Sequence, residues 1–156
     1  MYFQIAIVLH FIALSLLTAG GFGSLLLHRA LAAAVRQNSP QLPGLAAAAF
    51  RLSVAARIGS VLMLATGFLL AHAMDWVEFK MGWFLAKLTI YLVTWGLSFG
   101  LALPAASRLF PAIARRAAGE DTTAIIEASL ARLALFHALT VVAFLSMVSL
   151  VVYGTR

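Results

Sequence analysis

The chain has 156 residues, of which 63% are hydrophobic and only 10% carry a charge. Soluble domains carry roughly 25% charged residues, so this composition excludes an ordinary water-soluble globule. The chain contains no cysteine, which excludes disulfides, thiolate metal sites, cysteine nucleophiles and covalent haem attachment through a Cys-x-x-Cys-His motif. The length fits a single domain over residues 1–156, and the composition indicates a membrane protein.

Four apolar stretches are long enough to cross a bilayer. A spanning helix needs roughly 20 apolar residues, because the hydrocarbon core is about 30 Å thick and a helix rises about 1.5 Å per residue. The stretches that satisfy this requirement are residues 4–27, 52–74, 81–103 and 130–153. The first lacks the basic n-region of a signal peptide, and its apolar run is too long for one. We therefore predict an all-α fold, an integral membrane four-helix bundle.

The three connections between these spans differ in length and composition. The first, residues 28–51, contains a helix-breaking run of Asn, Ser, Pro and Gly. The second, residues 75–80, is predicted to be a tight turn. The third, residues 104–129, opens with Pro104, which we expect to end the third helix. In the same connection Asp121 is the expected N-cap of the fourth helix.

Basic residues collect at the first and third connections. They account for 8 of the 11 Lys and Arg residues, namely Arg29, Arg36, Arg51, Arg57, Arg108, Arg115, Arg116 and Arg132. By the positive-inside rule these connections face the cytoplasm, so the N and C termini and the 75–80 turn face the outer side. Alanine-rich residues 30–36 and 122–131 predict that the first and fourth helices continue beyond the bilayer. Residues 108–118 are expected to form a short interfacial helix whose arginines meet anionic headgroups.

The net charge of +6 therefore reflects the orientation of the chain in the membrane. We predict contact with the lipid bilayer and no nucleic-acid partner. Small residues in the spans, such as Gly96-x-x-x-Gly100 and the Ala19–Ser24 segment, let helices approach closely. They predict packing within the bundle, with a homo-oligomer interface as the alternative.

Ionisable residues within the spans are few, and none is acidic. They are His10, Arg57, His72, Lys87, Arg132 and His137, with His28 at the inner end of the first span. Charged groups are costly inside a bilayer, so each is a candidate for function, and the lack of carboxylates argues against ion-coupled transport. Neutral imidazole binds haem iron and transition metals. Two histidines on facing helices could therefore hold b-type haem without covalent attachment.

Two combinations of these side chains are open. The outer combination joins His10 with His72 or Lys87, and the inner one joins His28 with His137. We favour the outer combination, because the short second connection is expected to bring His72 and Lys87 near each other. Each residue also has a structural interpretation: His10 as an interhelical hydrogen bond, His72 as an interfacial residue, and Lys87 as a side chain that reaches the headgroups.

Four elements of the sequence match a known pattern. They are His10, Arg29 at the inner end of the first span, Gly67-x-x-Leu70-Ala71, and Gly82-Trp83-x-x-x-Lys87-Leu88. Together they resemble the HemJ family, small four-helix membrane proteins that oxidise protoporphyrinogen IX to protoporphyrin IX. The resemblance implies that His10 is a haem ligand, that Lys87 is a functional polar partner, and that Arg29 lies near the tetrapyrrole carboxylates.

The resulting hypothesis is a haem-b oxidoreductase of the bacterial inner membrane with a tetrapyrrole substrate. Its catalytic residues would be Lys87 and Arg29, its cofactor-binding residues His10, His72 and His137, and its metal ligand His10. Two alternatives stay open. One is a metal-handling protein similar to the CopD copper-resistance family, for which the histidines and scattered methionines are the motive. The other is a non-catalytic accessory subunit of a larger membrane complex.

Overall fold

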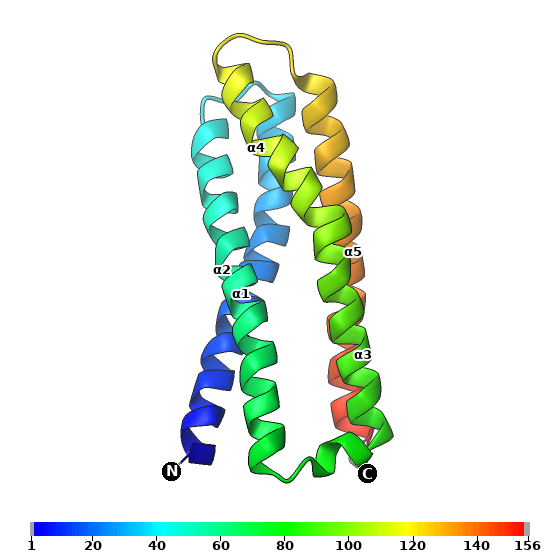
Figure 1. The fold of residues 1–156 in the computed structure, drawn as a ribbon. Helices are drawn as coiled ribbons and strands as arrows, with labels where there is room; N and C mark the ends of the chain where they lie inside the picture. Colours follow the sequence, from blue (N-terminus) through cyan, green and yellow to red (C-terminus); the bar gives the residue numbers. More distant parts are fainter. Residues whose placement is uncertain (1, 155–156) are drawn as a thin grey trace.

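The computed structural model describes residues 2–154, and this part of the chain is helical apart from short connections (Figure 1). It contains a 3₁₀ turn, η1 (Val77–Lys80), and a π-helical turn, η2 (Ser98–Ala102). The α-helices are α1 (Tyr2–Arg36), α2 (Leu42–Ala73), α3 (Gly82–Leu97), α4 (Leu103–Ala117) and α5 (Thr123–Gly154). The predicted all-α fold is confirmed.

Four helical segments are long and apolar enough to span a membrane: α1, α2, the continuous run Gly82–Ala117, and α5. The predicted number of spans is therefore confirmed. Both described ends of the chain lie at one end of the bundle, together with η1 (Figure 1). We call this the terminal end. The opposite end, where α4 finishes and the first and third connections lie, is called the arginine-rich end.

The expectation that Pro104 ends the third helix is wrong. Residues Ser98–Ala102 widen into a π-helical turn, and the Leu103 N–H donates to the Ser98 carbonyl five residues earlier. Pro104 then falls in the first turn of α4, where a missing N–H is tolerated. The helix therefore continues to Ala117, and the segment predicted to be a separate interfacial helix is the end of this long helix.

The arginine-rich end matches most of the local predictions. Helix α1 continues to Arg36 and α5 begins at Thr123, so both helices extend beyond the predicted spans. The N-cap of α5 is Thr122, whose carbonyl accepts the first intrahelical bond from the Ile126 N–H, so the predicted N-cap is displaced by one residue. Asp121 still caps the helix start from the preceding position, because its carboxylate accepts a hydrogen bond of 3.1 Å from the Thr123 N–H. Helix α2 begins at Leu42, earlier than its predicted span, with a proline in its first turn.

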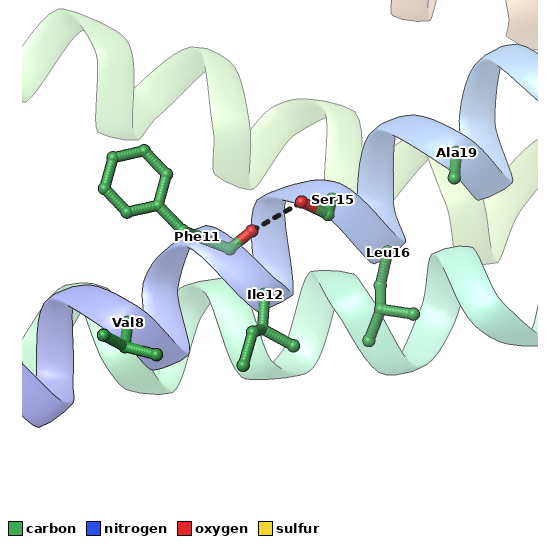
Figure 2. A pocket seen from close by; sticks show the side chains of 6 residues that line it. All are labelled: Val8, Phe11, Ile12, Ser15, Leu16 and Ala19. Atoms are coloured by element: carbon green, nitrogen blue, oxygen red, sulfur yellow. Dashed lines mark hydrogen bonds between the residues drawn. The ribbon is translucent and has the colours of Figure 1, made fainter.

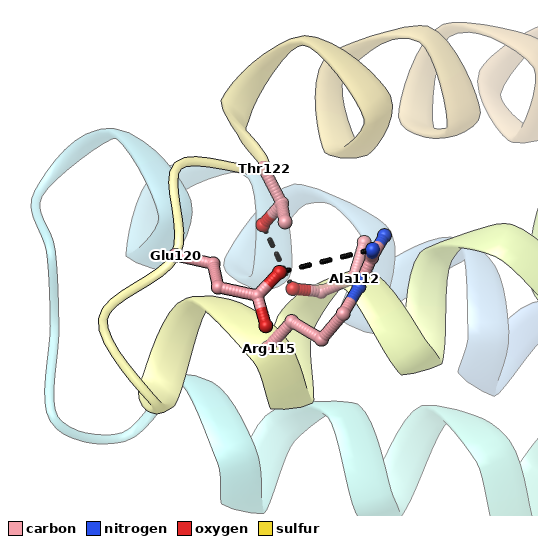
Figure 3. Close-up of polar contacts among 4 residues, drawn as sticks. All are labelled: Ala112, Arg115, Glu120 and Thr122. Carbon is pink, nitrogen blue, oxygen red and sulfur yellow. Dashed lines mark hydrogen bonds and ion pairs between the residues drawn. The ribbon is translucent and has the colours of Figure 1, made fainter.

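The packed core lies at the arginine-rich end. Its buried members come from α1, α2, α4 and α5 and are Leu31, Ala34, Val35, Leu42, Ala46, Leu109, Ala112, Ile113, Ile126 and Leu130. The connection after α4 is held over this core by the Thr122 hydroxyl, which donates to the Ala112 carbonyl at 2.8 Å, and by an Arg115–Glu120 ion pair at 3.8 Å (Figure 3). Burial of the apolar core side chains stabilises the arginine-rich end.

Away from this core the bundle consists of two helix pairs. Helix α1 packs along α2, while α3 packs against α5. The α1–α2 contact depends on glycine: a Cβ at Gly20 would lie 2.5 Å from the Ala56 nitrogen, and one at Gly59 would lie 2.5 Å from the Leu17 nitrogen. Small residues thus allow the two backbones to touch, as predicted for the Ala19–Ser24 segment. The prediction is wrong for Gly96-x-x-x-Gly100, because nothing in the described chain lies within 4 Å of a Cβ at either glycine.

Candidate functional site

His10 lies in the terminal half of α1 and faces α2. Its Nδ1 atom lies 2.9 Å from the Thr66 hydroxyl oxygen, and that hydroxyl donates its own hydrogen to the Leu62 carbonyl at 2.6 Å. A hydroxyl that donates its hydrogen to a carbonyl can also accept one, so this arrangement suits the His10 tautomer that is protonated at Nδ1. In that tautomer the Nε2 lone pair is left for another partner.

Gly67 provides space beside this ring. A Cβ atom at Gly67 would lie 3.7 Å from Cε1 of His10 and would be in van der Waals contact with it. Because glycine carries no side chain, no side-chain atom at position 67 of α2 fills the space next to the imidazole. The Gly67 element of the sequence pattern thus adjoins His10 in space.

Lys87 lies one turn into α3, at the same end of the bundle. Its ammonium sits 5.2 Å from the ring centroid of Trp83 and 5.0 Å from that of Phe84, within the range of cation–π attraction. The ammonium also interacts electrostatically with His10. The structure therefore brings His10 and Lys87, the two predicted site residues of the outer combination, into one region.

Glu78 is a residue of this region that the sequence interpretation missed. It lies on η1, its Oε2 atom is buried, and no hydrogen-bond partner for that atom is present in residues 2–154. Its charge also acts on the Lys87 ammonium. A buried carboxylate oxygen without a partner is costly. Because Glu78 falls in a connection, a search confined to the spans passes over it, although it precedes Lys87 by only nine residues.

Aromatic side chains surround η1. The Phe79 ring contacts Trp76 at 5.4 Å and Phe84 at 5.1 Å between centroids, and it stacks on Phe68 at 6.4 Å. This cluster places flat aromatic rings next to Lys87 and Glu78. Aromatic faces of this kind can stack on a planar ligand.

His72 does not join this group. Its exposed ring packs on Trp76, with 6.0 Å between centroids. Among the described residues it makes no hydrogen bond or ring contact with His10 or Lys87. Helices α2 and α3 do meet farther along, where the Tyr91 hydroxyl donates to the Ser60 carbonyl, but α3 packs mainly against α5.

Arg29 is also far from His10. It is exposed and lies 19 residues farther along α1, which at about 1.5 Å per residue is roughly 28 Å. The structure therefore does not place Arg29, Lys87 and His10 in one site.

The inner combination of histidines is brought together. The rings of His28 and His137 meet edge to face, with 5.4 Å between centroids and 77° between planes. His137 is 9% exposed, and its Nδ1 atom is buried without a partner in the described chain. The Ser24 hydroxyl, one turn before His28, is also buried and unpartnered. Each such atom costs about 1–3 kcal/mol, so this polar group calls for an explanation.

An open groove on α1 is a different kind of feature. It is lined by Val8, Phe11, Ile12, Ser15, Leu16 and Ala19 (Figure 2). Its one polar side chain, Ser15, donates to the Phe11 carbonyl of its own helix at 2.9 Å. The groove therefore offers no free polar anchor, and its apolar lining suits a lipid chain.

No protein-family model, curated protein or solved structure matches this chain. Within residues 2–154, no group of three or more His, Asp or Glu side chains forms a ready metal cage. Two polar groups remain: the His10 group, which we define as His10, Thr66, Glu78 and Lys87, and the His28–His137 pair with Ser24.

Proposed function

We propose that this chain is a multi-pass protein of the bacterial inner membrane that binds haem b through His10 and acts as an oxidoreductase, as its resemblance to HemJ implies. The observation that carries the proposal is the hydrogen bond between His10 and Thr66. The arginine-rich end would face the cytoplasm by the positive-inside rule, and the His10 group would lie in the outer half of the bilayer.

The His10–Thr66 contact suits a metal-ligating histidine. Such histidines usually donate their second ring N–H to a neighbouring acceptor, which sets the tautomer and the ring orientation. In the tautomer whose Nδ1–H donates to Thr66, Nε2 is the atom that would hold the iron. Lys87, whose charge acts on His10, would serve as a further polar partner.

Haem b would supply the capacity to accept electrons. The surrounding side chains would handle the substrate. The Lys87 ammonium is a cation that can pair with a carboxylate of a tetrapyrrole, and the aromatic cluster around η1 can cover its plane. Oxidation of a porphyrinogen releases protons, and the Glu78 carboxylate, whose Oε2 atom is buried, is the base within this group that would accept one. Arg29 takes no part in this proposal, because it lies at the other end of α1.

An absorption spectrum of the purified full-length protein in detergent tests the proposal. We expect a Soret band that is lost in His10→Ala and kept in His72→Ala, a control that removes an exposed histidine at the same end. Thr66→Val keeps the side-chain shape but removes the acceptor, so haem affinity should fall about 10–100-fold. A folded, colourless protein that takes up no added haem would contradict the proposal.

A metal-handling function is the second candidate. The observation that favours it is the contact of the half-buried His28 with the buried His137, because imidazole is a common ligand of transition metals. Metal analysis of the protein purified without added chelator distinguishes it from the haem protein.

A further inference from the structure

Four arginines lie at a similar height on different helices of the bundle. They are Arg29 on α1, Arg51 on α2, Arg108 on α4 and Arg132 on α5, and we call them the arginine collar. Each lies seven to nine residues from the end of its helix at the arginine-rich end, or about 10–14 Å at about 1.5 Å per residue. Short connections join these helix ends in pairs (Figure 1), so the collar surrounds the bundle at one level.

The charges of the collar have no partner within the protein. All four side chains are exposed, and none makes a hydrogen bond or an ion pair within residues 2–154. No acidic residue lies within four positions of a collar arginine along the chain. The arginines nearer the end of α4 differ, because Arg115 pairs with Glu120 and Arg116 donates to the Val35 carbonyl. The collar charges are therefore available to an anion from outside the chain.

The packing of the protein changes at the collar. Every buried member of the packed core lies beyond it: the core starts at Leu31 on α1 and Leu109 on α4, and Ala46 on α2 and Leu130 on α5 are its members nearest the collar. The large apolar side chains that the described chain exposes lie almost all on the other side, toward the terminal end. Apolar side chains are turned inward in water and need not be in lipid. The collar thus marks the level at which the surroundings change from lipid to water.

The distance from the collar to the terminal end fits the thickness of a bilayer. It covers Arg51–Ala73 on α2 and Arg132–Gly154 on α5, which is roughly 33 Å on each helix at about 1.5 Å per residue. The hydrocarbon core of a bilayer is about 30 Å thick. Tyr2, Trp76 and Tyr153 are exposed at the terminal end, and Tyr and Trp are typical of a membrane interface. The collar therefore lies at the level of the opposite headgroups.

Arg57 supports this placement of the membrane surface. It lies six residues from Arg51 on the terminal side of the collar, and its Nε and Nη2 atoms donate to the Ser53 carbonyl and hydroxyl, each at 3.2 Å. The guanidinium thus lies beside Ser53, back toward the collar. A charged side chain that begins within hydrocarbon extends toward the nearest polar surface in this way.

From these observations we propose that the arginine collar binds the phosphate groups of anionic phospholipids at the membrane surface, and that the packed core beyond it lies in water. A guanidinium binds a phosphate through two parallel hydrogen bonds. A phosphatidylglycerol headgroup carries a net negative charge, whereas the choline of phosphatidylcholine offsets its phosphate. The collar should therefore select the anionic lipid. This proposal does not depend on haem binding by the His10 group.

The first test measures lipid preference around the full-length protein in nanodiscs at 0.15 M salt. Phosphatidylglycerol and phosphatidylcholine with the same acyl chains each carry a nitroxide near the chain end, and the motionally restricted fraction of the electron paramagnetic resonance spectrum gives their relative affinity. We expect a preference of about fivefold for phosphatidylglycerol, the contribution of one arginine near a membrane surface. The variant with glutamine at all four collar positions should show no preference.

Two double variants with equal loss of charge separate the collar from the net charge of the protein. Arg29→Gln with Arg132→Gln should lower the preference at least about twofold, because two of the four phosphate contacts are removed. Arg36→Gln with Arg115→Gln removes exposed charges beyond the collar and should leave the preference unchanged, because salt screens them over about 8 Å. An equal fall in both variants, or no preference in the parent protein, would overturn the proposal.

A second measurement keeps the collar intact and therefore does not depend on the folding of the arginine variants. The chain has no cysteine, so single cysteines can be placed on α5 on either side of Arg132, at the exposed positions Ala128 and Leu139. In nanodiscs, Ala128→Cys should react with a water-soluble maleimide at least about tenfold faster than Leu139→Cys, because the reactive thiolate does not form in hydrocarbon. Equal rates in nanodiscs would show that the collar is not at the membrane surface.

Discussion

The two ends of the bundle are built differently. At the arginine-rich end, α4 buries Ala105, Leu109, Ala112 and Ile113 against its neighbours, much as a helix of a soluble protein would. At the terminal end, α3 has no buried residue at all. The α1–α2 and α3–α5 pairs there expose their apolar side chains instead.

This difference separates the packed core from the proposed haem site. The arginine-rich end is held by a protein core, by Thr122 over α4, and by Arg116, which donates to the Val35 carbonyl and to the Asn38 side chain. The terminal end depends on lipid, or on a ligand, to cover its apolar faces. It is also the end that holds His10, Lys87 and Glu78, whose Oε2 atom is buried without a partner in residues 2–154, so the proposed haem site lies in the less packed half.

Removal of a core side chain at the arginine-rich end should have the largest effect on stability. Leu109 is 1% exposed, so Leu109→Ala should lower the free energy of unfolding by about 2–5 kcal/mol, through lost burial and a new cavity. Leu103→Ala on the same helix is the matched control, because Leu103 is 41% exposed. Unfolding of both variants in detergent, followed by tryptophan fluorescence, measures the difference. Equal losses would mean that the core is not what stabilises this end.

A methyl group at the α1–α2 contact should have a smaller but sharply local effect. In Gly20→Ala the new Cβ would meet the Ala56 backbone at 2.5 Å, and backbone cannot move aside as a side chain can. We expect a loss of about 1–3 kcal/mol. Gly21→Ala adds the same methyl group to open space and should be neutral or slightly stabilising. The same unfolding assay compares the two adjacent variants, and similar losses would show that close α1–α2 contact is not required.

Most of the fold could be predicted from hydropathy and charge, because a bilayer leaves a chain little choice but apolar helices of about 20 residues. The failure at Pro104 is local. The rule that proline ends a helix assumes an unbroken α-helical hydrogen-bond register, whereas η2 shifts that register just before the proline. Nothing in the sequence around Ser98 marks a π-helical turn.

The candidate site could be predicted only in part. His10 and Lys87 stand out, because ionisable residues are rare in spans. Their partners do not. Thr66 bonds to its own helix, as Thr18, Thr89 and Thr140 also do, and its role depends on how α1 and α2 are rotated against each other. His72 was placed near Lys87 from connectivity alone, which cannot show that α3 packs on α5.

The smallest predicted effect is a pH dependence confined to the arginine-rich end. Hydrogen bonds from the Thr123 backbone N–H and then from its side chain, with a further contribution from Arg116, hold the pKa of Asp121 below its ordinary value of 3.8. A carboxylate whose pKa is depressed on folding stabilises the fold above its unfolded pKa and loses that contribution as the pH falls through the folded value. The stability gap between the parent and Asp121→Asn should therefore be constant above about pH 5 and narrow below about pH 4. Thermal unfolding across this range measures it. Asp121→Ala lacks the acceptor as well as the charge, so it should remain less stable than Asp121→Asn at every pH. If the stability gap between the parent and Asp121→Asn does not change with pH, the Asp121 charge does not contribute to holding the start of α5.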